Sequence, residues 1–361
     1  MKVLFCGGGT AGHVYPAIAM AEILQHKYPK LTVHFIGRCG GDENKAITDA
    51  GFPLTVLNVQ GLSRRSVKKS AESAIAALRA VSIAKKFLRE YNPDVVIGTG
   101  GYVCYPVFSA AVRLGIPCLM HESNATPGLV TRLFAKRCRS VMLGFSRCAG
   151  ELPRGTRCIY TGNPTRRAFT AITKPMARRI LGIPDSEFLV VSFGGSLGAE
   201  AINNAVAEYM SKPHHGTTVI HATGKRYYDN IAKKHPDLTK KQGSRILPYI
   251  ENMPLYLSAA DIAITRSGAM TLAELAVTGT PAILIPSPNV SGNHQYKNAE
   301  AECRSGRSML LPEKELTAEA LSAAILEMRK RRYSAPPRVG KSPSVEVADK
   351  ILKAITPYVK I

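Results

Sequence analysis

Short apolar runs alternate with helical patterns along the whole chain, and this alternation limits the fold more than any other feature of the sequence. The apolar runs are continuous, as expected for parallel strands that helices cover on both faces. The candidate strands are Val3–Cys6, Thr32–Ile36, Val95–Ile97, Cys118–Met120, Ser140–Leu143, Leu189–Phe193, Thr217–His221, Ile262–Thr265 and Ala282–Ile285. The sequence therefore predicts an α/β fold with parallel sheets.

The pattern restarts about halfway along the chain. A glycine-rich turn, Gly7–Gly12, follows the first strand, and a second, Gly194–Gly198, follows the strand at 189–193. A length of 361 residues fits two domains of roughly 150 residues each. We predict two Rossmann-like domains that join near Gly162-Asn163-Pro164, and a helical tail over Val345–Val359.

The formal net charge of +22 favours an anionic partner, which leaves nucleic acid, anionic lipid and phosphorylated substrates open. No apolar run reaches the roughly 18 residues that span a bilayer, and Met1 leads straight into a predicted strand, so we expect neither a membrane span nor a signal peptide. The eight cysteines include no Cys-x-x-Cys pair, which favours free thiols and a reducing cytosol over a disulfide framework or a zinc site.

Each glycine-rich turn could bring backbone N–H groups and a helix N-terminus close to a diphosphate. The first turn contains Gly8, Gly9, Thr10 and Gly12, and in the second Ser196 adds a hydroxyl donor. A tight strand-to-helix turn without a ligand is the alternative for each. No P-loop lysine follows, which argues against a nucleoside triphosphatase.

Polar residues follow three predicted strands, where ligand sites of α/β proteins collect. His13 comes directly after the first turn and is a candidate general base; a histidine bonded to nearby backbone is the alternative. His121-Glu122-Ser123-Asn124 could orient hydroxyls or transfer a proton, or could simply cap the loop. Tyr102, after Gly100-Gly101, either lines the site or packs.

In the second half, Arg266-Ser267-Gly268-Ala269 follows a strand and precedes a predicted helix that carries Glu274. A carboxylate there could accept hydrogen bonds from a ribose diol, or could lie on a solvated helix face. The segment Asn293–Asn298, which includes Gln295, offers amides suited to sugar hydroxyls.

These motifs follow one another in a characteristic order. They are Gly8–His13, Gly100–Tyr102, His121–Asn124, Gly162–Pro164, Gly194–Ala199, Arg266–Ala269 and His294–Ala299. Together they closely resemble glycosyltransferase family 28, in particular its bacterial members that convert lipid I to lipid II. The resemblance covers essentially the whole chain. Ala11 is a departure, because the family often has glycine at this point of the first loop.

The resemblance implies the GT-B fold, with two Rossmann-like domains. An N-terminal domain over residues 1–163, joined by the C-terminal helix at 345–361, would take the acceptor, and a domain over 164–344 would bind UDP-N-acetylglucosamine (UDP-GlcNAc). The implied donor-binding residues are Thr10, Gly12, Asn124, Arg166, Ser196, Ile250, Met253, Ala269, Glu274 and Gln295. Gly8, Gly9, Gly100 and Gly101 would face the diphosphate of lipid I.

The implied reaction is an inverting transfer of N-acetylglucosamine to the C4 hydroxyl of the N-acetylmuramic acid (MurNAc) unit of lipid I, in peptidoglycan synthesis and hence in cell shape and division. Inverting transfer needs a base, for which we favour His13, with Glu122 as rival and Tyr102 as a helper. The sequence has no Asp-x-Asp pair to hold a divalent ion, so we expect no metal and no cofactor; helix N-termini and Arg166 would stabilise the leaving diphosphate.

A lipid-linked acceptor implies work at the cytoplasmic face of the plasma membrane. The basic segment at 62–91 has an apolar strip of Ile75 and Leu78 bordered by Lys68, Lys69, Arg79 and Lys85, which predicts peripheral binding to anionic lipid. Alternatively, Ile75 and Leu78 face the core of the protein and do not bind lipid. Other cell-wall synthesis proteins are further candidate partners.

Two other functions compete with this hypothesis. A UDP-GlcNAc 2-epimerase would have a similar fold and bind the same nucleotide sugar, but it needs no lipid acceptor. A basic nucleic-acid-binding protein would fit the charge, but 7% aromatic residues, the absence of tryptophan and the lack of a nucleic-acid-binding motif argue against it.

Overall fold

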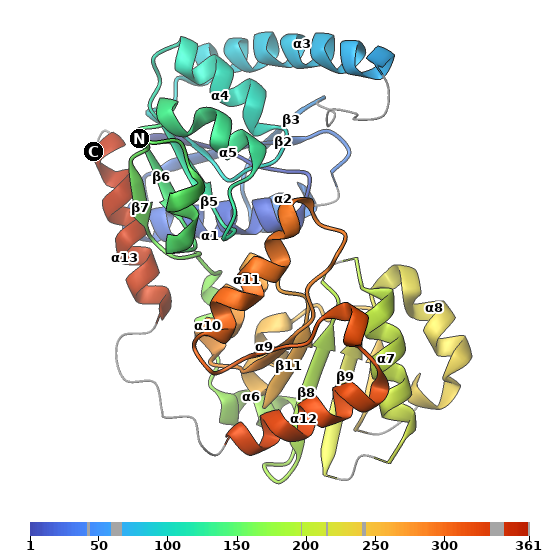
Figure 1. The fold of residues 1–361 in the computed structure, drawn as a ribbon. Coiled ribbons are helices and arrows are strands. Elements are labelled where there is room, and N and C mark those ends of the chain that lie inside the picture. Colours follow the sequence, from blue (N-terminus) through green and yellow to red (C-terminus); the bar gives the residue numbers. More distant parts are fainter. Residues whose placement is uncertain are drawn as a thin grey trace. The chain divides into compact units, whose positions relative to one another are not determined.

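The computed structural model describes residues 1–41, 44–58, 67–195, 197–213, 216–239, 243–332 and 343–359, with backbone but not side chains at 11, 67–78, 291, 332 and 343. The chain forms two compact units, Met1–Arg166 with Ser344–Ile361, and Arg167–Pro343. Each unit has its own parallel sheet with helices around it (Figure 1), which confirms the predicted α/β class. The predicted join after residue 163 and the observed boundary after Arg166 lie close together.

The first unit contains a parallel sheet with the strand order β3-β2-β1-β4-β5-β6-β7. Its strands are β1 (Lys2–Cys6), β2 (Thr32–Arg38), β3 (Leu54–Leu57), β4 (Val95–Gly98), β5 (Cys118–Glu122), β6 (Ser140–Leu143) and β7 (Cys158–Tyr160). Its helices are α1 (Ala11–Lys27), α2 (Asn44–Asp49), α3 (Val67–Tyr91), α4 (Cys104–Arg113), α5 (Leu129–Phe134) and α13 (Pro343–Ile355).

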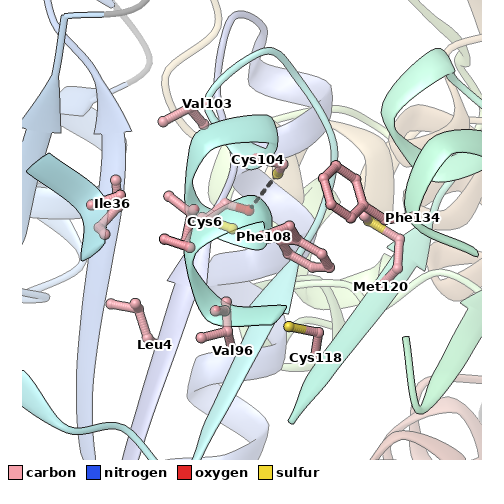
Figure 2. Close-up of a cluster of buried hydrophobic side chains, with 14 of the residues drawn as sticks. Leu4, Cys6, Ile36, Val96, Val103, Cys104, Phe108, Cys118, Met120 and Phe134 are labelled. Atoms are coloured by element: carbon pink, nitrogen blue, oxygen red, sulfur yellow. Dashed lines mark hydrogen bonds between the residues drawn. The ribbon is translucent and has the colours of Figure 1, made fainter. Parts of the chain in front are cut away.

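Two apolar clusters fill the two faces of this sheet, because successive side chains of a strand point to opposite faces. On one face, Leu4 and Cys6 of β1 pack with Phe108 of α4 and Phe134 of α5. Figure 2 shows this cluster, in which the Cys104 thiol donates a hydrogen bond to the Cys6 carbonyl at 3.1 Å.

On the other face, Val3 and Phe5 pack with α1 and with Ile351 and Ile355 of α13. The C-terminal helix therefore completes the core of the first unit, although it comes last in the sequence.

The second unit contains a sheet with the order β10-β9-β8-β11-β12-β13, again parallel. Its strands are β8 (Phe188–Phe193), β9 (Thr217–Ala222), β10 (Arg245–Leu247), β11 (Ile262–Thr265), β12 (Ala282–Leu284) and β13 (Met309–Leu310). Its helices are α6 (Lys174–Leu181), α7 (Glu200–Ser211), α8 (Lys225–Lys234), α9 (Met253–Ala259), α10 (Ala269–Thr278), α11 (His294–Cys303) and α12 (Ala318–Arg332).

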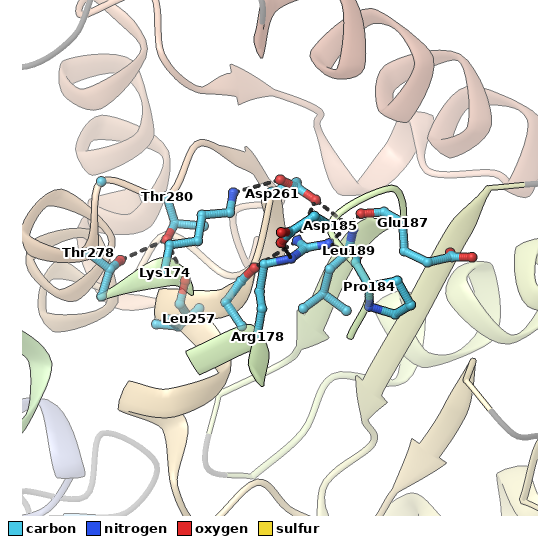
Figure 3. A network of polar contacts seen from close by, with 12 residues as sticks. Lys174, Arg178, Pro184, Asp185, Glu187, Leu189, Leu257, Asp261, Thr278 and Thr280 are labelled. Carbon is cyan, nitrogen blue, oxygen red and sulfur yellow. Dashed lines mark hydrogen bonds and ion pairs between the residues drawn. The ribbon is translucent and has the colours of Figure 1, made fainter. Parts of the chain in front are cut away.

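A buried ionic network joins the amino ends of β8 and β11 in the second unit (Figure 3). Asp261, fully buried directly before β11, accepts hydrogen bonds from Arg178 at 3.2 Å, from Lys174 at 2.6 Å and from the backbone N–H of Leu189 at 2.8 Å. Arg178 also donates to the carbonyls of Pro184 and Glu187. The network ties α6 and the turn before β8 to the sheet.

Two details differ from the sequence prediction. β5 continues through Glu122, so His121 and Glu122 belong to the strand rather than to the loop after it. The four edge strands, β3, β7, β10 and β13, were not predicted.

All eight cysteines are free thiols. Within the described ranges, every helix is too short or too polar to cross a membrane.

Candidate functional site

The site in the first unit is built around His13, the third residue of α1. Its Nδ1 lies 3.0 Å from the carbonyl oxygen of Thr99, which follows β4, and the Thr99 hydroxyl donates to the His13 carbonyl at 2.6 Å. A carbonyl oxygen can only accept, so Nδ1 carries the proton and Nε2 is the basic nitrogen of the neutral ring. Thr99 thus fixes both the tautomer and the orientation of His13.

Two glycine loops meet beside this histidine. Gly100 and Gly101 have φ angles of +105° and +85°, which L side chains rarely adopt. A Cβ on Gly101 would lie 1.8 Å from the Gly8 carbonyl oxygen, and one on Gly100 would lie 2.7 Å from His13 Nδ1. The structure therefore brings together the two loops that the sequence predicts to face the acceptor diphosphate, with the His13 ring beside Gly100. Tyr102 follows them and is exposed.

Glu122 is buried at the end of β5, and its two carboxylate oxygens accept four hydrogen bonds. Oε1 accepts from the backbone N–H and the side-chain amide of Asn124, at 3.0 and 3.3 Å. Oε2 accepts from the N–H of Gly128 at 2.9 Å and from the hydroxyl of Thr131 at 2.7 Å. The carboxylate holds the loop from β5 to α5, including Asn124, in place. This arrangement favours a positioning role over that of a base.

His121 lies beside Glu122 with no exposed surface, and burial lowers its pKa to about 4. Its Nε2 lies 3.3 Å from the Gly162 carbonyl and its Nδ1 lies 3.3 Å from the Ser123 hydroxyl. Asn163 donates to the Ser123 carbonyl at 3.0 Å. The motifs at 121–124 and 162–164 therefore form one polar cluster. Protonation of His121 is disfavoured near neutral pH, so a structural role fits it best.

In the second unit, the glycine turn after β8 packs against the loop after β9. A Cβ on Gly198, whose φ is +76°, would lie 2.1 Å from the Thr223 carbonyl oxygen. That same carbonyl accepts a hydrogen bond at 2.9 Å from the buried amide of Asn203 in α7. The close approach positions the N-terminus of α7 beside the turn. Ser196, the predicted hydroxyl donor, lies outside the described residues.

A second cluster lies at the carboxyl ends of β11 and β12. The Ser267 hydroxyl donates to the Gln295 backbone carbonyl at 2.7 Å, and Asn298 donates to the Ser267 carbonyl at 3.2 Å. The Gln295 side-chain oxygen accepts from the Ser287 N–H at 2.9 Å. These bonds lock the start of α11 onto the loop that precedes Ala269, the first residue of α10. They also fix the orientation of the Gln295 amide.

The remaining predicted donor-site residues are placed as follows. Glu274 is half-buried on α10; Ile250 is buried between β10 and α9, and Met253 begins α9. Arg166 belongs to the first unit, where its guanidinium lies 4.6 Å from the ring centroid of Tyr15 in α1. The sequence analysis places Arg166 in the second domain, which it begins at residue 164. Packing on α1 explains this difference.

The predicted membrane patch is only partly described. The backbone of α3 is helical over Val67–Tyr91, but the side chains of Lys68, Lys69, Ile75 and Leu78 lie outside the described residues. Arg79 is exposed and Lys85 is half-buried. Among side chains that are described, no three His, Cys, Asp or Glu residues group in a way that could hold a metal ion.

The sequence analysis did not assign a role to Thr99, which orients His13, or to Asn203, which bonds the Thr223 carbonyl that Gly198 approaches. Thr99 directly follows β4 and Asn203 comes soon after the turn at 194–198, which is the signal that could have found them. Their partners are distant along the chain, as in the bond from Thr99 to the His13 carbonyl, so the pairings themselves could not be deduced.

Two parallel α/β units, each with glycine-rich loops at the carboxyl ends of its strands, are the architecture of the GT-B fold. Residues 3–143 match the glycosyltransferase family 28 N-terminal domain, and residues 189–351 match the family 28 C-terminal domain. The chain belongs to glycosyltransferase family 28.

Curated relatives match over almost the full length. The chain is 39% identical over 334 residues to the UDP-N-acetylglucosamine--N-acetylmuramyl-(pentapeptide) pyrophosphoryl-undecaprenol N-acetylglucosamine transferase of Acetivibrio thermocellus, covering 92% of this chain and 90% of that protein. It is 38% identical to the enzyme of the same name from Thermoanaerobacter sp., covering 99% and 100%.

Solved structures show the same fold. Acinetobacter baumannii MurG superposes with a TM-score of 0.71 at 26% identity, over 98% of this chain and 94% of that one. The UDP-GlcNAc 2-epimerase of Neisseria meningitidis superposes with a TM-score of 0.66 at 14% identity, over 99% and 100%. At that identity, the second likeness shows the fold alone.

Proposed function

We propose that this protein transfers N-acetylglucosamine from UDP-GlcNAc to the C4 hydroxyl of the MurNAc unit of lipid I, which forms lipid II. The observation that carries the proposal is the near full-length similarity to curated relatives named for this transfer. The geometry around His13 supplies a chemical basis for it.

On the acceptor side, the loops of Gly8–Gly9 and Gly100–Gly101 would face the diphosphate of lipid I. Their contact leaves no room for a Cβ on Gly101, and glycine lets backbone N–H groups approach a phosphate closely. The N-terminus of α1 adds a positive electrostatic potential to the same place.

His13 would act as the general base. As the acceptor C4 oxygen forms its bond to the anomeric carbon, Nε2 takes the hydroxyl proton and the bond to the UDP oxygen breaks, with inversion at that carbon. The hydrogen bond from Nδ1 to Thr99 would strengthen as the ring gains charge. Tyr102 lies in the adjoining loop, where it could assist in holding the acceptor.

On the donor side, the turn of residues 194–198 and the N-terminus of α7 would stabilise the leaving diphosphate, with Ser196, Thr10, Gly12 and Arg166 as further donors. A helix N-terminus supplies this stabilisation without a divalent ion, so the proposal includes no metal and no cofactor. Glu274 would hold the ribose diol. Asn124, Gln295 and the backbone of Ala269 would hold the sugar, and Ile250 and Met253 the uracil.

Because lipid I is membrane-anchored, the proposal includes peripheral binding at the cytoplasmic face of the plasma membrane. Anionic lipid would be attracted by the basic residues of α3, with Ile75 and Leu78 as the apolar part of the patch. Each basic side chain near such a surface contributes about 1 kcal/mol. Binding to anionic vesicles that is unchanged in an Ile75→Ser/Leu78→Ser variant would remove this patch from the proposal.

A transfer assay with radiolabelled UDP-GlcNAc and a lipid I analogue, with and without EDTA, tests the function. We expect labelled disaccharide product in both conditions. Activity that disappears with EDTA and returns with a divalent ion would refute the metal-free mechanism. Incubation with UDP-GlcNAc alone distinguishes the epimerase, because an epimerase forms the manno isomer without an acceptor.

A further inference from the structure

An exposed apolar strip runs along two neighbouring helices of the first unit. Tyr102, which precedes α4, and Tyr105, at its start, are 52% and 39% exposed, and Leu129 and Leu133 of α5 are 67% and 49% exposed. Leu129 and Leu133 are four residues apart and so share one face of α5. We call these four side chains the α4–α5 strip. Single exposed apolar residues are common, but four on adjoining elements mark a candidate binding surface.

Packing beneath the strip fixes its two halves relative to each other. The Tyr105 ring meets the Phe134 ring edge-on, with centroids 5.9 Å apart. Phe134 is buried and also packs against Phe108 of α4 at 5.5 Å. Figure 2 shows Phe134 beside Cys104 and Phe108 of α4. The strip is therefore a preformed surface, because the buried aromatic residues below hold α4 and α5 together.

The strip begins where the proposed acceptor loops end. Tyr102 directly follows Gly101, which touches Gly8, and Leu129 directly follows Gly128, whose N–H is bonded to Glu122 at 2.9 Å. These two segments leave β4 and β5, which are neighbours in the sheet, at their carboxyl ends. A ligand whose diphosphate lies at the glycine loops would thus meet apolar side chains next.

Basic side chains border the strip. Lys136 and Arg137 follow α5 and are exposed, and the Arg137 guanidinium lies 6.0 Å from the centroid of the Phe134 ring. Arg113 is exposed at the end of α4. These cations lie at or directly after the ends of α4 and α5, so the strip itself offers apolar side chains to an apolar chain, while the glycine loops would take the anionic head.

We propose that the α4–α5 strip binds the first isoprene units of the acceptor's polyprenyl chain and so selects acceptors that carry such a chain. This inference rests on the proposed function, since it needs the acceptor diphosphate at the glycine loops. It concerns contact with the substrate's own chain, which is separate from the attraction of α3 to a bilayer.

A kinetic comparison without membranes tests this binding surface. The wild type and a Leu129→Ser/Leu133→Ser variant receive two soluble lipid I analogues, one with a chain of two isoprene units on the diphosphate and one with a methyl group. We expect the variant to raise the KM for the prenyl acceptor by about tenfold and to leave the KM for the methyl acceptor and for UDP-GlcNAc within about twofold, since burial of apolar side chains stabilises only the prenyl complex.

Two control variants accompany this test. Leu129→Met/Leu133→Met, which keeps the apolar area, should retain the preference for the prenyl acceptor. Ile180→Ser, at an exposed apolar residue of α6 in the second unit, should leave both KM values unchanged. Thermal unfolding of each variant shows whether it is folded.

Each outcome separates this inference from the proposed function. Equal losses with both acceptors, or no change with either, would refute a chain-binding strip. Weaker binding to anionic vesicles with unchanged discrimination between the two soluble acceptors would assign the strip to the bilayer and also refute the proposal. Absence of transfer by the wild type to either acceptor would instead refute the proposed function itself.

Discussion

Two buried carboxylates, one in each unit, have opposite surroundings. Glu122 lies at the carboxyl end of β5, and its four hydrogen-bond donors are neutral: two backbone N–H groups, an amide and a hydroxyl. Asp261 lies at the amino end of β11, and two of its donors, Arg178 and Lys174, are cationic. Glu122 holds the loop that directly follows it, whereas Asp261 bonds the backbone of Leu189, which is distant in the sequence.

The difference follows from what each end of a parallel sheet does. Ligand sites of α/β proteins collect at the carboxyl ends of the strands, where loops must stay accessible and shaped for a substrate. The amino ends can be closed permanently by an ionic network. We therefore expect changes at the carboxyl ends to affect activity first, and changes at the amino ends to affect stability first.

The largest effect should come from His13→Ala, at the carboxyl end of the first unit. We expect kcat to fall by about 10²–10⁴-fold, because this is the usual contribution of a positioned general base. Binding of UDP-GlcNAc, measured by calorimetry, should remain nearly unchanged, and so should the unfolding midpoint. A variant with normal turnover would exclude His13 from the chemical step.

At the amino end of the second unit, Asp261→Asn should reverse this pattern. Loss of the negative charge leaves the buried Arg178 guanidinium without its buried counter-ion, and breaking such a pair typically costs about 3–5 kcal/mol of the free energy of unfolding. Denaturant unfolding measures the loss, while the KM for UDP-GlcNAc in the folded fraction should stay close to the wild-type value.

Asp185 provides a matched control, because its carboxylate also lies 3.5 Å from Arg178 but is almost fully exposed. Asp185→Asn should leave the unfolding midpoint unchanged, since water already solvates that charge. Equal destabilisation by the two substitutions would mean that burial of Asp261 does not decide its contribution.

Glu122→Gln tests the buried carboxylate of the first unit, at the carboxyl end of β5. One oxygen becomes an NH₂ group that faces existing donors, so we expect a loss of about 2–3 kcal/mol in the free energy of unfolding. Displacement of Asn124 should lower kcat as well. Thr131→Val, which removes one of the four hydrogen bonds, should cost about 1 kcal/mol. A Glu122→Gln enzyme of wild-type stability but without activity would restore Glu122 as the rival base.

The strand interiors could be predicted from sequence, but the sheet edges could not. Central strands such as β4 and β8 are buried along their whole length, and their apolar runs are therefore continuous. The edge strands β3, β7, β10 and β13 have only one neighbour and are mostly half-buried. They are two to four residues long, and such short runs are hard to distinguish from loops in the sequence.

For the site, the sequence predicted which residues would gather at the carboxyl ends of the strands, because topology alone places them there. It could not predict the hydrogen bonds. Glu122 was a candidate base by residue type, and its four partners became visible only in three dimensions. Asp261 looks like an ordinary polar residue before a strand; its partner Arg178 lies 83 positions away.

Two buried histidines extend the comparison to pH. His121 on β5 and His221 on β9 both have no exposed surface, and burial lowers the pKa of each to about 4. Both ring nitrogens of His121 have partners. His221 Nδ1 lies 3.0 Å from the Ser192 hydroxyl, while its Nε2 has no hydrogen-bond partner among the described residues. The two rings should therefore respond differently to substitution.

Acid should destabilise the fold through both rings. Each has a pKa of about 4 when folded and about 6.5 when unfolded, so the unfolded state binds more protons as the pH falls below about 6.5. The stabilisation is present above that pH and is lost progressively towards pH 4. At pH 5, each histidine lowers the free energy of unfolding by about 2 kcal/mol relative to pH 7. Urea unfolding at the two pH values measures this difference.

Substitution separates the two contributions. His221→Leu should be tolerated at pH 7, with a loss of about 1 kcal/mol for the unpaired Ser192 hydroxyl, because no hydrogen bond to Nε2 is broken. It should also reduce the difference in stability between pH 7 and pH 5 by about 2 kcal/mol, since the contribution of that ring is gone. His121→Leu should remove the same share of the acid sensitivity but cost more at pH 7, because the bonds to Gly162 and Ser123 are lost. If His221→Leu left the pH dependence unchanged, protonation of that ring could not be what limits acid stability.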